Sequence, residues 1–240
     1  MPLIIGALWD YVSRGGMMMI PLLICSLLGL IFVIERAITY YRIKGDTAEI
    51  FSEIRESLLQ GNLRRSIEVC EAYDHPVATT LKSGLLRYGK NHEEIEKAME
   101  SVSLHEVSKL EKGLWILATL ANVTPLFGFL GTVTGMISSF DALARVGLGN
   151  PEAVASGISV ALITTATGLI IALPVQAAYN YFNSRVSSLA LDMETSASML
   201  LETFNEVEER HSREQASPRA GAGGSPVVDS ALRLSREGSA

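Results

Sequence analysis

Residues 113–140 read GLWILATLANVTPLFGFLGTVTGMISSF, and residues 153–184 read AVASGISVALITTATGLIIALPVQAAYNYFNS. Neither stretch contains a charged residue over its 28 and 32 positions, and Met17 to Ile34 is uncharged over another 18. A bilayer core about 30 Å thick is crossed by roughly 20 apolar helical residues. Three such stretches in one chain predict an all-α, polytopic membrane protein and exclude an ordinary soluble domain.

The charge distribution predicts how the chain is divided around these stretches. We expect a short N-terminal segment (1–16), three membrane-spanning helices (17–41, 113–140 and 154–183), a charged helical domain (42–112), a loop (141–153), a helical extension of the third span (184–210) and a tail (211–240). Two spans are thus expected to continue into a helical bundle outside the membrane. The tail is rich in Ser, Gly, Ala and Pro, which predicts disorder. It is interpreted as a solubilising end, with a docking peptide at residues 230–236 as the alternative.

Lys and Arg near the span ends predict the orientation, because cytoplasmic flanks carry the excess of these residues. Only Arg14 precedes the first span and only Arg145 lies between the second and third, whereas seven basic residues flank the charged domain: Arg36, Arg42, Lys44, Arg55, Lys97, Lys109 and Lys112. We therefore predict a periplasmic N-terminus and a cytoplasmic C-terminus. The first span is expected to stay uncleaved, since it lacks the basic n-region of a signal peptide and is too long for one.

The charged domain has the pattern of short helices. Helical spacing of apolar residues runs from Asp46 to Gln60, where Gly61-Asn62 predicts a stop. Two further helices are expected over 63–73 and 77–88. Asn91 is a candidate N-cap for a fourth helix. Nothing in the pattern interrupts this helix, which we expect to continue through Lys112 into the second span.

Several classes of function are excluded by the sequence. The net charge of −6, without a block of Lys and Arg, argues against a nucleic-acid surface. Cys25 lies in an apolar stretch and Cys70 in the charged domain, so a disulfide or a Cys-based metal site is not expected. No nucleotide-binding or hydrolase motif occurs. The four histidines show no ligand spacing and are interpreted as surface or interhelical residues: His75, His92, His105 and His211. We expect no catalytic, cofactor or metal site and no enzyme activity.

Small residues recur along both long apolar stretches. The second span carries Thr124, Gly128, Gly131, Gly135 and Ser138, and the third carries Gly157, Ala161, Thr165, Gly168 and Ala172. Such stripes let helix backbones approach closely in lipid, within a subunit or between subunits. We interpret them as packing faces.

Hydroxyl groups accompany the small residues: Thr124, Thr132 and Thr134 in the second span, and Thr164, Thr165 and Thr167 in the third. A threonine in a helix often donates to its own i−4 carbonyl and is then chemically inert. The alternative is a polar lining suited to water or to an ionisable group of a partner. Pro125 and Pro174 favour this alternative, because proline frees backbone carbonyls at these depths.

The two span sequences resemble a known family. LANVTPLFGFLGTVTGMISSF (120–140) and SGISVALITTATGLIIALP (156–174) are similar to the span signatures of the MotA/TolQ/ExbB proton-channel family, nearer to ExbB and TolQ than to MotA. The resemblance implies a long-helix bundle in the Gram-negative inner membrane, assembled as a homopentamer around single-span partners of the ExbD or TolR kind. It implies a proton-driven stator that acts on a TonB- or TolA-like protein. By motif, Thr132 and Thr165 match the family's pore threonines, which face the partner's membrane aspartate.

One position departs from the family pattern. Relatives carry a glutamate after Gly-Ile-Ser in the third span, where this chain has Val160. An intramembrane carboxylate is a functional group by default. The charged pair Glu35-Arg36 ends the first span, and an anchoring role at the membrane rim is favoured over an ion-carrying one. Two functions therefore remain: a conducting motor subunit whose acid comes from the partner, or a non-conducting scaffold of the same fold. The scarcity of carboxylates disfavours a multi-ligand Na⁺ site relative to H⁺.

Overall fold

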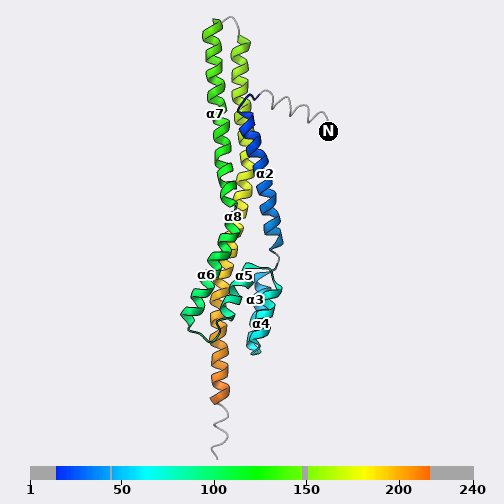
Figure 1. Ribbon diagram of the computed structural model, residues 1–240, viewed down its shortest axis with the longest axis vertical. Coiled ribbons are helices and arrows are strands. Elements are labelled where there is room, and N and C mark those ends of the chain that lie inside the picture. Colours follow the sequence, from blue (N-terminus) through cyan, green and yellow to red (C-terminus); the bar gives the residue numbers. More distant parts are fainter. Residues whose placement is uncertain (1–14, 44, 148–150, 217–240) are drawn as a thin grey trace, which may run out of the picture. The chain divides into compact units, whose positions relative to one another are not determined.

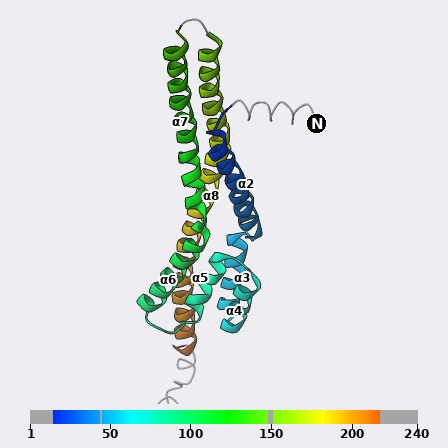
Figure 2. The ribbon, with the colours of Figure 1, turned by 45° about the horizontal axis from the view of Figure 1, so that its top comes forward.

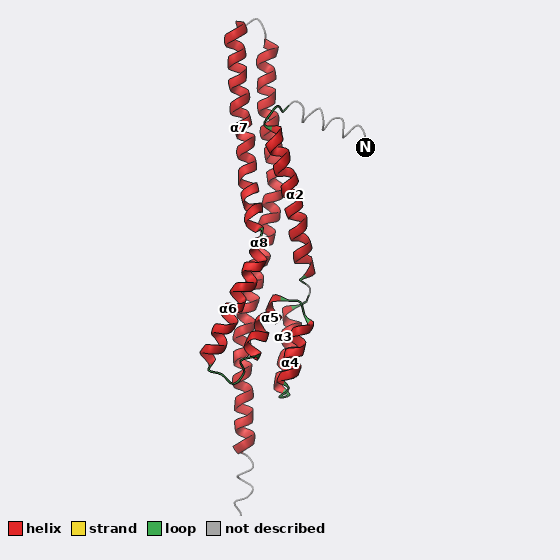
Figure 3. Ribbon diagram, viewed as in Figure 1, coloured by secondary structure: helices red, strands yellow, loops and turns green. Residues whose placement is uncertain are grey.

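The structure is a computed structural model that describes residues 15–43, 45–147 and 151–216. These residues form helices, turns and loops but no strand (Figure 3). The helices are α2 (Met19–Arg42), α3 (Thr47–Leu59), α4 (Leu63–Ala72), α5 (Pro76–Leu85), α6 (His92–Glu111), α7 (Leu114–Val146) and α8 (Pro151–Ala216). Three helical stretches, which begin at Met19, Leu114 and Val154, are long and apolar enough to cross a membrane. The predicted all-α membrane fold is confirmed.

The chain divides into two compact units. The first comprises residues 1–44 and 103–192, and the second comprises residues 45–102 and 193–240. The boundaries fall inside α6 and α8, so each of these helices contributes residues to both units. The first unit contains all three uncharged stretches, and the second contains most of the charged domain.

The first unit is built on α2, α7 and the first part of α8, which run beside one another in both views (Figures 1 and 2). Its core is apolar and takes side chains from each of these helices and from the end of α6: Cys25, Leu110, Leu114, Leu117, Leu120, Ala121, Val175, Phe182 and Val186. The outward faces are also apolar, with Leu27, Phe129 and Leu173 more than half exposed. Such surfaces are expected of helices that meet lipid or other membrane helices.

The helix expected to run without interruption from Asn91 into the second span is broken. α6 ends at Glu111 and α7 begins at Leu114, and between them Gly113 has a φ of +88°. Only glycine adopts this left-handed conformation at little steric cost, and it cannot continue a right-handed helix. The apolar periodicity does not predict this break, because a single glycine is compatible with a helical pattern.

The second unit contains α3, α4, α5 and the parts of α6 and α8 assigned to it. Asp46 caps α3 by accepting a hydrogen bond from the Ala48 N–H, and Asn62 caps α4 by accepting from the Arg65 N–H. Gly61 lies between these helices with a φ of +76°, which agrees with the stop predicted at Gly61-Asn62. Fully buried side chains fill the interior of the unit: Ile50, Ile54, Leu81, Met99 and Leu200.

The helices of the first unit continue beyond the predicted span ends. α7 extends to Val146 and α8 begins at Pro151, so helix occupies much of the loop expected over 141–153. At its other end α8 extends to Ala216, past the extension expected to end at residue 210. The tail predicted to be disordered over 211–240 is therefore helical as far as Ala216, and residues 217–240 lie outside the described part of the chain, as do residues 1–14.

Candidate functional site

The region that carries the span signatures is a close antiparallel seam between α7 and α8. A Cβ atom on Gly128 would lie 3.2 Å from the Thr164 carbonyl oxygen and 3.2 Å from Thr165 Cα. A Cβ atom on Gly168 would lie 3.1 Å from Gly128 Cα. The helix backbones therefore touch here, which only residues without a side chain allow.

The same seam continues toward the loop between the two helices. A Cβ atom on Gly131 would overlap the Thr164 side chain, and one on Gly135 would lie 2.8 Å from the Gly157 carbonyl and 2.9 Å from Ala161 Cβ. Six small residues of the two stripes lie on this seam: Gly128, Gly131, Gly135, Gly157, Ala161 and Gly168. Within one chain, the two stripes face each other.

Ser139 is a seam residue that the sequence pattern did not single out. Its side chain is buried, and its hydroxyl donates to the carbonyls of Gly135, at 3.0 Å, and of Val154, at 3.1 Å. Ser138, which the pattern included, is exposed and donates back to Thr134. A spacing of four residues from Gly135 would have identified Ser139, but spacings of three and four are both compatible with one helix face.

The two candidate pore threonines have different environments. The Thr165 hydroxyl, which is half-buried, donates a 2.9 Å hydrogen bond across the seam to the Gly128 carbonyl. Thr132 is half-buried as a whole residue, but its hydroxyl is exposed and donates within α7 to the Phe129 carbonyl, at 2.6 Å. Thr164 is fully buried and donates to carbonyls of its own helix. Thr165 therefore has a structural contact that Thr132 lacks.

Val160 lies near the start of the first span. A Cβ atom on Gly16 would lie 3.5 Å from Val160 Cγ1, and one on Gly15 would lie 3.5 Å from Ile163. Val160 and Thr165 are five residues apart, so they project about 140° from each other around α8. Val160, where the family resemblance implies a glutamate, therefore faces a different direction from Thr165.

Val160 also lies at the opposite end of the span from the Glu35-Arg36 pair. The Tyr40 ring, one turn beyond Arg36, stacks on Phe182 of α8 with the ring centroids 5.2 Å apart. The 22 residues from Val160 to Phe182 rise about 33 Å along the helix axis, close to the thickness of a bilayer core of about 30 Å. The segment of α8 from Val160 to Phe182 is thus long enough to cross a bilayer core.

The Glu35-Arg36 pair is part of a contact between α2 and the α6–α7 break. Arg36 donates to both carboxylate oxygens of Glu35, at 2.6 and 3.3 Å, and its side chain is only 9% exposed. A Cβ atom on Gly113 would lie 3.4 Å from Arg36 Nε. The Tyr40 hydroxyl donates to the Leu110 carbonyl at 3.0 Å. This arrangement favours the anchoring interpretation of the pair, since Arg36 is held against the break.

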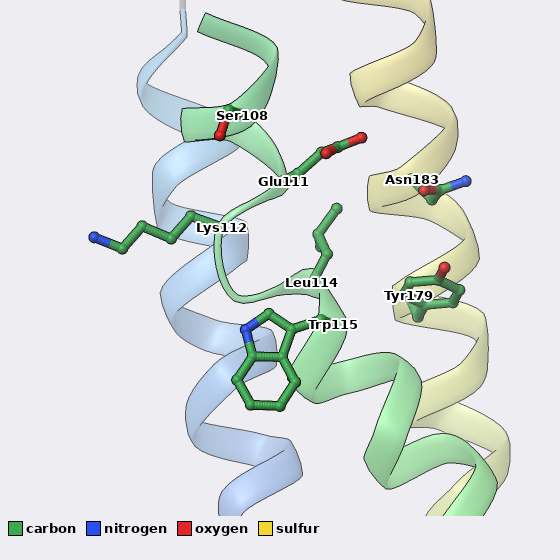
Figure 4. A pocket seen from close by; sticks show the side chains of 7 residues that line it. All are labelled: Ser108, Glu111, Lys112, Leu114, Trp115, Tyr179 and Asn183. Carbon is green, nitrogen blue, oxygen red and sulfur yellow. The ribbon is translucent and has the colours of Figure 1, made fainter. Parts of the chain in front are cut away.

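Beside the break lies an open pocket of about 490 Å³ (Figure 4). Its lining comes from the end of α6, the start of α7 and one face of α8: Ser108, Glu111, Lys112, Leu114, Trp115, Tyr179 and Asn183. Figure 4 shows the Glu111 side chain directed toward the side where Asn183 lies and the Lys112 side chain directed away from it. Among the described residues, no group of His, Cys, Asp and Glu is arranged to hold a metal ion.

The chain is similar in sequence to known proteins over a region that includes the second and third spans. The family described as the MotA/TolQ/ExbB proton channel family matches residues 71–195. A biopolymer transport protein ExbB homolog of Methanothermobacter thermautotrophicus is 32% identical over 183 residues, which are 75% of this chain and 64% of the relative. The ExbB-like 3 protein of Synechocystis is 31% identical over 71% of this chain and 82% of its own length. The Tol-Pal system protein TolQ of Pseudomonas aeruginosa is 42% identical over 40% of this chain and 42% of its own length.

The matched regions include the α7–α8 seam, because the family match at residues 71–195 covers the second span and the third. The chain spans just under two thirds of the length of the Methanothermobacter relative. With three helices able to cross a bilayer, it is a multi-pass membrane protein. The resemblance inferred from the span sequences is confirmed: this chain belongs to the MotA/TolQ/ExbB proton channel family and is an ExbB/TolQ-like member of it.

Proposed function

We propose that the chain is the stator subunit of a motor driven by the proton-motive force in the bacterial inner membrane. It would couple proton flow to force on an envelope protein of the TonB or TolA kind. The observation that carries this proposal is the α7–α8 seam, where the family signature coincides with half-buried threonines in an otherwise uncharged membrane region. Hydroxyl groups at such a position are suited to line a path for water and protons.

The proposed stator is a homo-oligomer, with five subunits by analogy with the family, around a single-span partner similar to ExbD or TolR. Within one chain the glycine stripes are used between α7 and α8, so contacts between subunits would use the exposed apolar faces. Phe129 and Leu173, which are 64% and 69% exposed, belong to such faces. A ring is the closed result of a head-to-tail interface. Native mass spectrometry that detects only monomers, with and without the partner, would argue against this assembly.

The proton-carrying acid would come from the partner. Neither 113–140 nor 153–184 contains Asp, Glu, Lys, Arg or His, and hydroxyl groups do not store a proton. A carboxyl group buried in the membrane has a raised pKa, because desolvation disfavours its charged form. Its neutralisation then removes the cost of moving a charge past an apolar wall. Thr132 and Thr165 would face this group in the ring.

Sidedness is part of the proposal. The N-terminus would be periplasmic and the C-terminus cytoplasmic, because basic residues concentrate around the charged domain. Under this orientation the Glu35-Arg36 pair is at the cytoplasmic rim and Val160 is in the periplasmic half of its span. A reporter enzyme that is active only in the periplasm, fused to the C-terminus, should be inactive.

A non-conducting scaffold is the second candidate, and one observation favours it. Val160 replaces the carboxylate that relatives carry in the third span. The discriminating experiment is proton uptake by liposomes that contain the full chain and its single-span partner. The stator proposal requires uptake above that of liposomes without the complex, and a fully assembled complex without uptake would favour the scaffold.

A further inference from the structure

Polar side chains continue along one face of α8 beyond Thr165. Gln176, Asn180 and Asn183 lie 11, 15 and 18 residues after Thr165. With 3.6 residues per turn, all four project within about 60° of one another. Thr165 and Gln176 are half-buried, whereas Asn180 and Asn183 are exposed. The face that bears the candidate pore threonine therefore becomes a row of carboxamides toward the Glu35-Arg36 end of the span.

Two of these amides form a hydrogen-bonded pair. Gln176 Nε2 donates to Asn180 Oδ1 at 2.9 Å. Among the described residues, no protein group accepts from Asn180 Nδ2 or donates to Gln176 Oε1. The pair thus presents one amide donor group and one carbonyl acceptor to its surroundings, which is the pattern that a bound water molecule satisfies.

Gln176 lies just inside the Glu35-Arg36 end of the span, whereas Asn180 lies about level with that pair. Gln176 precedes Phe182 by six residues, which is about 9 Å along the helix. Phe182 is level with Tyr40, just past the Glu35-Arg36 pair, as their ring stacking shows. An amide at this depth is unfavourable against lipid tails, which offer no hydrogen bond. The face with Gln176 and Asn180 therefore requires water or polar protein next to it.

Other polar groups of the spans have less need of a hydrogen-bond partner outside their own helix. The Asn122 amide, exposed on α7, donates to the Ala118 carbonyl of its own helix at 2.7 Å. The Thr167 hydroxyl donates to Ile163 at 2.8 Å. The Thr167 hydroxyl hydrogen and one of the two Asn122 amide hydrogens are thus bonded within one helix. The Gln176–Asn180 pair uses one amide hydrogen for its own bond and leaves the others, with the Gln176 carbonyl oxygen, without a partner among the described residues.

We propose that the Gln176–Asn180 pair is a water-binding site that forms the segment of the ion pathway between Thr165 and the aqueous phase at the Glu35-Arg36 end. Its role in conduction rests on the proposed stator function, whereas its hydration does not. The amides do not titrate. They hold water between a donor and an acceptor, so that a proton added to the water chain at one end is balanced by a proton released at the other. No bond of the protein forms or breaks.

Hydration is tested by thiol accessibility in the full chain, expressed with its single-span partner, after Cys25 and Cys70 are replaced by alanine. Gln176→Cys is compared with Ala177→Cys, which lies at the same depth but about 100° around the helix. A membrane-impermeant methanethiosulfonate reagent is added from the Glu35-Arg36 side. We expect position 176 to react at least tenfold faster than position 177. Equal rates, or an unreactive position 176, would overturn the proposal.

Conduction is tested separately by proton uptake into liposomes. Gln176→Met and Asn180→Leu remove the amides at nearly constant volume, and Asn122→Leu is the matched control. We expect uptake to fall at least fivefold in the first two variants and less than twofold in the control. Uptake equal to that of the unaltered complex would overturn the role in conduction. Loss of the oligomer in native mass spectrometry would assign the pair to subunit packing and also overturn it. If the unaltered complex itself shows no uptake, the stator proposal fails, while the thiol comparison still decides hydration.

Discussion

The hydroxyl of Thr165 donates a 2.9 Å hydrogen bond to the backbone carbonyl of Gly128, so a threonine expected to face the ion path also ties α8 to α7. The bond is possible because Gly128 brings the two backbones into contact. At this position, helix packing and the proposed conduction depend on the same side chain. Substitutions at Thr165 therefore need controls that separate the two roles.

Thr165→Val should lower both seam stability and proton-driven activity, whereas Thr165→Ser should preserve both. Valine is close to threonine in size but lacks the hydroxyl, so the interhelical hydrogen bond is lost, at a cost of about 1 kcal/mol. Thermal unfolding in detergent measures the stability, and proton uptake measures the activity. A serine variant as impaired as the valine variant would contradict the role given to the hydroxyl.

Thr132→Val should lower activity without loss of assembly, because the Thr132 hydroxyl donates only within its own helix. Thr134→Val is the matched control: Thr134 also donates within α7, to Gly131, but projects about 200° away from Thr132. We expect the control to retain most of its proton uptake. If Thr132→Val and Thr134→Val impair assembly to the same extent, packing explains both threonines.

Gly135→Ala should destabilise the seam by about 1–3 kcal/mol, the usual cost of overpacking. The new methyl group would lie 2.8 Å from the Gly157 carbonyl, which is backbone and cannot rotate away. Ser138→Ala, on the exposed side of the same helix, should change stability by less than 0.5 kcal/mol, as surface substitutions usually do. The measurement is the thermal midpoint of the detergent-solubilised chain. Equal midpoints for the two variants would contradict the seam.

Cys70 should react slowly with thiol reagents at pH 8, since burial raises the pKa of its thiol to about 12. In a Cys25→Ala variant, iodoacetamide labelling of folded protein should be at least tenfold slower than labelling of unfolded protein. The raised pKa also has a consequence for stability. The folded state keeps the thiol protonated while the unfolded state loses the proton near pH 9, so stability should fall between pH 9 and 12. Labelling equally fast in both states would contradict the burial of Cys70.

The glycine spacing of the two spans predicted a packing face on each helix, but not which helix each face meets or the details of the contact. Gly128, Gly131 and Gly135 recur at spacings of three and four residues along α7, and such spacings specify a face. The choice between Ser138 and Ser139 depends on the exact rotation of α7, which spacings of three and four residues leave open. Likewise, the sequence identified Thr165 but not its partner, since a backbone carbonyl has no signature in the sequence.

The contact around Gly113 could not be predicted from the sequence for a different reason. A glycine in a helical pattern is compatible with an unbroken helix, and its left-handed conformation depends on neighbours that are distant in the chain. Arg36 lies against Gly113, and Tyr40 donates to Leu110, one of the last carbonyls of α6. The sequence predicted a charged rim at Glu35-Arg36 but gave no indication that this rim meets the α6–α7 break.

Proton uptake by liposomes that hold the full chain with its single-span partner is the most direct test of the central claim. The partner's membrane aspartate is changed to asparagine in one sample, and Val160 is changed to glutamate in another. The account predicts that the asparagine variant abolishes uptake, because no acid remains in the membrane to carry the proton. It predicts that Val160→Glu is tolerated, since the family resemblance implies a glutamate at this position. Full uptake with the asparagine variant would contradict the account and direct attention to Glu35.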